Sequence, residues 1–133
     1  MSIFDKDIHH PIEHLYDACR DIVDHVIPMN MMHYNGQCET MQRDIMFELK
    51  NLDLLTNRFK PAARNSSDVG KINKVDVKYG GFIRGIPTYI VEFFYVEEIF
   101  SDEWFGGSAI RYEAPFARFT AGINGVIHES VQQ

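Results

Sequence analysis

The spacing of the apolar residues changes once along this chain of 133 residues. Before Pro61 the apolar residues recur every three or four positions, which is typical of amphipathic helices, and after Asn73 they alternate with polar residues, which is typical of strands. A polar connector separates the two parts. Because helices followed by a run of strands favour an α+β fold, the sequence predicts two N-terminal amphipathic helices packed on a curled antiparallel sheet of about four to five strands.

The length of the chain suits one domain. Hydrophobic residues make up 45% of the sequence and charged residues 24%, which is typical of a folded globular protein and not of a disordered one. We therefore expect residues 1–133 to form a single domain, with a helical part over 11–59 and an antiparallel sheet over 72–131.

Two helices are predicted in the first half of the chain. The first is expected over 11–26, where apolar residues share one face, and Pro28 should end it because proline disfavours helical geometry at the residue before it. The residues from Met29 to Gly36 are expected to connect the helices. The second helix is expected over 37–59, and its wide apolar stripe predicts contact with more than one neighbour.

The strands are predicted from alternation and from turn residues. A first strand should end at a tight turn at Gly80-Gly81, and a long central strand should run from Thr88 to Glu98 after an interruption at 85–87. The apolar positions change phase after Pro115, which predicts a bulge or bend. A turn at Asn124-Gly125 leads into a short last strand.

The central strand is apolar on both faces. One face carries Tyr89, Val91, Phe93, Tyr95 and Ile99, and the other carries Ile90, Phe94, Val96 and Phe100 beside Glu92 and Glu98. Two helices can cover only one face of a sheet, so the other face requires a folded-over part of the sheet, a ligand or another subunit. This surplus of apolar surface motivates a function in association.

A run of acidic residues adjoins a pair of aromatic residues after the central strand. Aromatic anchors surrounded by carboxylates are typical of an interface with a basic partner, although a solvated sheet end has a similar composition. The partner-binding candidates are Glu97, Glu98, Asp102, Glu103, Trp104 and Phe105. The net charge of −6 and the scattered basic residues argue against nucleic acid as the partner.

No set of residues predicts catalysis or a cofactor. His9, His10 and His14 gather around the start of the first helix, but a third ligand with metal-binding spacing is missing, so no metal ligand is predicted and their metal binding stays open. Cys19 and Cys38 lie on apolar stripes, where thiols usually pack. Without a secretory signal or a membrane-length apolar stretch, we expect a cytoplasmic protein that makes no membrane contact.

The leading hypothesis is a non-catalytic protein that acts through protein–protein association. It would be a subunit of a symmetric homo-oligomer, or an acidic inhibitor or immunity-type protein that binds a basic partner. The alternative is a small enzyme or ligand-binding protein with an apolar pocket between helices and sheet, where Glu92 and Arg118 would be the charged groups unless they form a salt bridge or face water. The pocket would be lined by Tyr89, Glu92, Phe93, Tyr95, Tyr112, Arg118 and Phe119.

Overall fold

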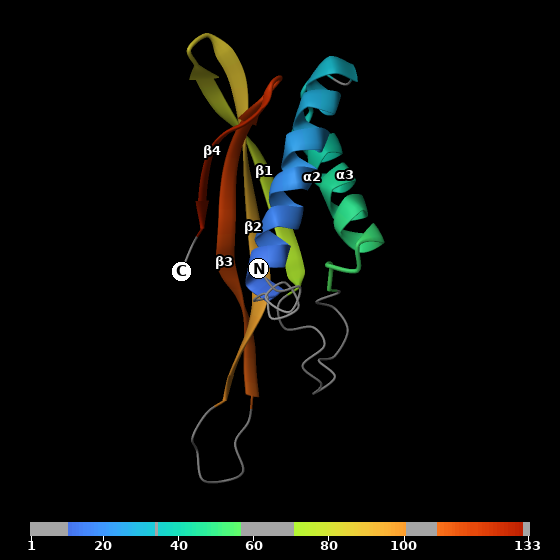
Figure 1. Cartoon of the computed structure of the whole chain (residues 1–133), viewed down its shortest axis with the longest axis vertical. Coiled ribbons are helices and arrows are strands. Elements are labelled where there is room, and N and C mark those ends of the chain that lie inside the picture. Colours follow the sequence, from blue (N-terminus) through green and yellow to red (C-terminus); the bar gives the residue numbers. More distant parts are fainter. Residues whose placement is uncertain (1–10, 34, 57–70, 101–108, 132–133) are drawn as a thin grey trace, which may run out of the picture.

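The computed structural model describes residues 11–33, 35–56, 71–100 and 109–131 (Figure 1). Two helices precede four strands, and the elements are α2 (Pro11–His33), α3 (Cys38–Asn51), β1 (Ile72–Ile83), β2 (Ile86–Phe100), β3 (Ala109–Gly122) and β4 (Gly125–Val131). The predicted α+β fold, with two N-terminal helices and an antiparallel sheet, is confirmed, and the sheet has four strands.

The strands follow one another across the sheet in the order β1-β2-β3-β4, and each neighbouring pair is antiparallel. The sheet formed by these four strands is open. Both helices lie side by side on one face of the sheet, with α2 against β3 and β4 and α3 against β1 (Figure 1). The described elements therefore form two layers, and the opposite face of the sheet is left without a helix.

The core lies between these layers. Helix α2 contributes one buried stripe, helix α3 contributes Met41, Ile45 and Leu49, and the strands contribute the rings of Phe93 and Phe119. Phe119 packs against Phe93 with ring centroids 5.8 Å apart and against Tyr16 of α2 at 5.4 Å. The buried residues of α2 are Leu15, Cys19, Ile22, Val23, Val26 and Ile27.

Helix α2 continues through Pro28 to His33, so the predicted end at residue 26 is wrong. Proline removes one backbone donor and crowds the preceding turn, but tertiary packing can override this local preference. Here Ile27 and Asn30 are fully buried on either side of Pro28. The Asn30 amide donates to the Val26 carbonyl and to Asp44 of α3, both at 3.0 Å, which holds this part of the helix against its neighbour.

Helix α3 ends at Asn51, eight residues before the predicted end at 59. Asp53 adopts a left-handed conformation with φ 58°, and the Leu54 and Asp53 amides donate to the carbonyls of Leu49 and Lys50. These two bonds form a Schellman motif, which stops a helix by satisfying its last carbonyls. Leu55 then pairs with Ile72 at the start of β1 in an isolated bridge. This residue of the predicted apolar helix stripe therefore contacts the sheet outside the helix.

The first hairpin turns at Arg84-Gly85 and not at the predicted Gly80-Gly81. Ile83 pairs with Ile86, and both loop residues have positive φ, 51° at Arg84 and 78° at Gly85, which defines a type I′ turn. A register shift between Tyr79 and Gly81 places the two glycines in a bulge inside β1. Phe82, which would follow the predicted turn, therefore belongs to the end of β1.

The predicted irregularity after Pro115 is confirmed. Phe93 pairs with Ala117 and Phe94 pairs with Pro115, so Phe116 is an extra residue in β3. Phe116 and Ala117 are both buried, which means that two consecutive side chains enter the core. This bulge explains why the apolar positions change phase before Phe119.

Replacing Phe119 should reveal how strongly the fold depends on its ring. Phe119 is fully buried (0% exposed), so Phe119→Ala should lower the free energy of unfolding by about 3–5 kcal/mol, through lost burial and a new cavity. Phe47 on α3 is 60% exposed, and the same change there should cost no more than about 0.5 kcal/mol. Urea unfolding of both variants measures the difference, and equal losses would contradict this description of the core.

Candidate functional site

The predicted acidic partner-binding loop falls at the limit of what the structure describes. Glu97 and Glu98 belong to β2, where they pair with Tyr112 and Arg111 of β3. The other four candidates, Asp102, Glu103, Trp104 and Phe105, lie outside the described residues. The interaction loop therefore stays a prediction.

Four aromatic residues of the predicted pocket, Tyr89, Phe93, Tyr95 and Phe119, lie on the helix-facing side of the sheet. Tyr95 contacts Phe116 with ring centroids 5.5 Å apart, and Tyr89 is buried near the connection between the helices, where Gly36 lies against its hydroxyl group. Together with the Phe93–Phe119 contact, these rings fill space between the sheet and α2. Tyr112 takes its place in β3 opposite Glu97.

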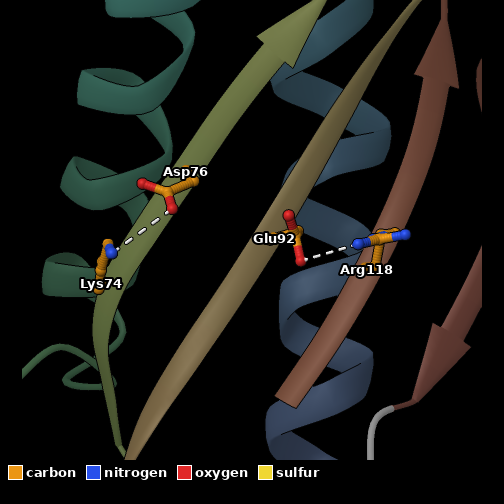
Figure 2. A network of polar contacts seen from close by, with 4 residues as sticks. All are labelled: Lys74, Asp76, Glu92 and Arg118. Atoms are coloured by element: carbon orange, nitrogen blue, oxygen red, sulfur yellow. Dashed lines mark hydrogen bonds and ion pairs between the residues drawn. The ribbon is translucent and has the colours of Figure 1, made fainter. Parts of the chain in front are cut away.

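Glu92 and Arg118, the two charged candidates for that pocket, lie on the opposite face of the sheet. Figure 2 shows their side chains turned away from the helices and joined by an ion pair of 3.2 Å. Their side chains are 21% and 47% exposed, respectively. The six pocket candidates whose side chains are described are thus divided between two faces, and the structure does not bring the charged pair to the buried rings.

A second ion pair lies on the same helix-free face. Lys74 and Asp76 of β1 form an ion pair (Figure 2), with their charged atoms 3.6 Å apart. The Lys74 ammonium also lies 4.9 Å from the centre of the Phe94 ring. Long charged side chains can cover apolar neighbours with their methylene groups. Ile90 and Phe94 are accordingly only partly exposed. In its described part, this face is more polar than the pattern of β2 alone predicted, because β1 and β3 place polar residues on both sides of it.

Exposed apolar side chains gather instead where the hairpins turn. Phe82 is 68% exposed and Tyr79 is 51% exposed, and their rings form an edge-to-face pair 6.2 Å apart. The β1–β2 hairpin, the β3–β4 turn and the last turn of α2 lie at the same end of the molecule (Figure 1). We call the exposed large apolar residues of these three segments, together with the exposed Arg84, the turn-end surface, which consists of Met32, Tyr79, Phe82, Arg84 and Ile123.

A groove of about 500 Å³ runs between the two helices. Its apolar part is formed by Ala18, Ile22 and Leu52, and carboxylates stand along both sides. On α2 it extends from His14 to His25, which is about 17 Å at 1.5 Å per residue. We call it the helix groove, and its residues are His14, Asp17, Ala18, Asp21, Ile22, His25, Glu48 and Leu52.

The described residues that line the helix groove do not form a metal-binding cluster. Among the residues that the structure describes, no three His, Cys, Asp or Glu side chains are arranged to hold a metal ion. His14, one of the three histidines considered from the sequence, lines the groove, while His9 and His10 lie outside the described residues. What the groove offers is an apolar floor between carboxylates, a combination suited to an apolar and cationic segment.

Two cysteines and one tyrosine near the helices have raised pKa values, and in each case packing of the fold is a cause. Burial raises the pKa of Cys19 and of Cys38, so both thiols stay protonated and poorly nucleophilic. Arg20 of α2 forms an ion pair of 2.6 Å with Glu129 of β4, and the same carboxylate accepts a hydrogen bond from Tyr16. This cluster ties α2 to the last strand.

Tyr16 should titrate well above an ordinary tyrosine. Burial, the hydrogen bond to Glu129 and the charge of that carboxylate raise its pKa to about 12, from an ordinary value of about 10. Because the folded state holds this proton more tightly, the stability it confers is complete below about pH 10 and is lost as the pH rises towards 12. Burial also raises the pKa of Tyr89, so the test depends on the variants: ultraviolet titration should show a component with a pKa of about 12 that Tyr16→Phe removes and Glu129→Gln shifts downwards. An unshifted titration curve in Glu129→Gln would contradict the assignment.

Comparison with known proteins adds no function to these surfaces. Neither of the described helices is long and apolar enough to cross a membrane. No protein-family model matches this chain, and no curated protein or solved structure matches it either. The functional argument therefore depends on the surfaces themselves.

Proposed function

We propose that this protein acts by binding another protein, and that the turn-end surface is its main contact. The observation that supports this proposal is the exposed pair of aromatic rings, Tyr79 and Phe82, next to the exposed Arg84. Aromatic residues, methionine and arginine are enriched at protein interfaces, whereas lysine and the acids are depleted. Tyr79, Phe82 and Arg84 belong to the enriched types.

The arrangement of these residues strengthens the proposal. Single exposed apolar side chains are common and need no explanation. Here, however, they come from three separate segments that lie at one end of the molecule (Figure 1). A surface assembled from distant parts of the chain can present a continuous apolar area to a partner.

The aromatic pair is also held in place before any partner binds. The Tyr79 ring packs edge-to-face on the buried Tyr89 at 5.5 Å, and the Thr88 hydroxyl donates to the Gly81 carbonyl at 2.9 Å within the adjoining bulge. A side chain that is ordered in the free protein loses less entropy on binding. Tyr79 and Phe82 are thus suited to act as anchors.

The ligand-pocket alternative has no comparable support. It needs a charged group among the buried rings, but Glu92 and Arg118 pair with each other on the other side of the sheet. The two cysteines are not poised for nucleophilic chemistry, because burial raises the pKa of each thiol. Association explains the exposed aromatic rings, and a pocket would not.

Replacing Phe82 should weaken association without unfolding the protein. We expect Phe82→Ser to reduce binding by about 30-fold or more, which is the range of an interface hot spot, while the matched variant Phe47→Ser on the exposed face of α3 leaves it unchanged. Light scattering over a range of concentrations reports self-association, and capture from a native extract on the immobilised chain reports other partners.

Two results would refute the proposal. One is a strictly monomeric protein that retains no other protein from the extract. The other is a Phe82→Ser variant that matches both the wild type and Phe47→Ser in every arm. Far-ultraviolet circular dichroism and urea unfolding confirm in parallel that the variants are folded.

A further inference from the structure

We infer that the partner is a second copy of this chain, whose helix groove receives the tip of the β1–β2 hairpin, residues 82–86. This inference depends on the proposed function, because it uses the same turn-end surface and names its occupant. The contact would join two different surfaces, a tip on one copy and a groove on the next. The evidence comes from charge, apolar character, size and backbone conformation.

The charges of the two surfaces are complementary. Arg84 is exposed at the tip and takes part in none of the ion pairs formed among the described residues. In the groove, Asp17, Asp21 and Glu48 likewise have no Lys or Arg partner within the described part of the chain. Across the contact, the Arg84 guanidinium could therefore pair with a groove carboxylate that has no such partner among the described residues.

The apolar parts of the two surfaces also match. Beside Arg84 the tip carries Phe82, whose side chain is 68% exposed, and the half-buried Ile83 and Ile86. The floor of the groove is formed by Ala18, Ile22 and Leu52, and Leu52 is itself 53% exposed. If the Phe82 ring packed on this floor, both the ring and the Leu52 side chain would be removed from solvent. Such burial is typical of an anchor residue in its pocket.

The sizes are compatible as well. The groove extends about 17 Å along α2, whereas two paired strands lie about 5 Å apart. The tip is a hairpin with only two loop residues, Arg84 and Gly85, so nothing beyond the turn obstructs its entry. Along α2 the groove is therefore long enough for a blunt two-stranded tip, and its volume is about 500 Å³.

The backbone conformation of Arg84 supports a binding role for its side chain. The first position of a type I′ turn needs positive φ and is usually Asn, Asp or Gly, but Arg84 takes it at φ 51°. Left-handed conformations are unfavourable for a residue of this kind, and they concentrate at functional sites. A residue that strains the turn but presents an unpaired guanidinium fits a binding role better than a structural one.

A tip-to-groove contact has a definite consequence for assembly. The two surfaces differ, so each bound copy still offers a free tip at one side and a free groove at the other. Such heterologous contacts produce a ring when the rotation closes and a filament when it does not. A face-to-face dimer, in contrast, would stop at two copies.

Mixing two defective variants tests this inference. The tip variant, Phe82→Ser with Arg84→Gln, keeps its groove and carries an uncharged tip, and the groove variant, Asp21→Lys with Glu48→Lys, keeps its tip. Each should be monomeric alone at concentrations where the wild type associates. Mixed together they should form a 1:1 dimer and nothing larger, because only one complementary pair of surfaces remains, and light scattering with analytical ultracentrifugation measures that mass.

A matched control and three contrary outcomes make the test decisive. The control, Glu39→Lys with Asp76→Lys, changes the net charge equally outside the groove and should associate like the wild type. The inference is overturned if the mixture stays monomeric, if the groove variant alone still associates, or if the control loses association as well. If the wild type is monomeric but captures a different protein through Phe82, the proposed function stands and this inference alone fails.

Arg84→Asn provides a separate test of the turn. Asparagine accepts the left-handed conformation more readily, so the variant should unfold at a higher urea concentration than the wild type. At the same time it lacks the guanidinium and should associate about tenfold more weakly, as expected for loss of an interfacial arginine. Association at wild-type strength would show that Arg84 does not pair with the groove and would overturn the inference.

Discussion

The packing of Phe119 between Phe93 and Tyr16 determines which face of the sheet lies beneath the helices. Because side chains alternate between the two faces along a strand, this contact also determines the face on which the neighbouring strand residues lie. The bulge at Phe116 preserves it along β3, since without the extra residue either Phe116 or Phe119 would leave the core. The ion pairs on the reverse face and the position of the hairpin tip are consequences of the same arrangement.

The features that depend on local periodicity could be predicted from the sequence. The change from helical to strand spacing gave the α+β fold, and the change of phase after Pro115 gave the bulge. Features decided by tertiary contact were missed. Pro28 looked like a helix end because the buried Asn30 and its bond to Asp44 are invisible in the sequence, and Gly80-Gly81 looked like a turn because glycine suits bulges and turns alike.

The candidate site was harder to predict than the fold. Period-two alternation already separates Glu92 from Tyr89, Phe93 and Tyr95, so the charged pair could have been placed opposite the rings once a single sheet was assumed. The turn-end surface could not, because the exposure of Phe82 depends on where the hairpin turns. The helix groove depends on which faces of α2 and α3 meet, which no spacing within one helix reveals.

A chain with a net charge of −6 can bind copies of itself only if local attraction exceeds general repulsion. At physiological ionic strength, exposed charges more than about 8 Å apart are largely screened from each other. This screening distance is shorter than the helix groove. Most of the acidic residues of two copies would therefore interact weakly, while an arginine within the groove lies inside the screening distance of its carboxylates. Contact between the tip and groove is consequently governed by the few charges that meet there, and the remaining negative charge slows the encounter more than it weakens the complex.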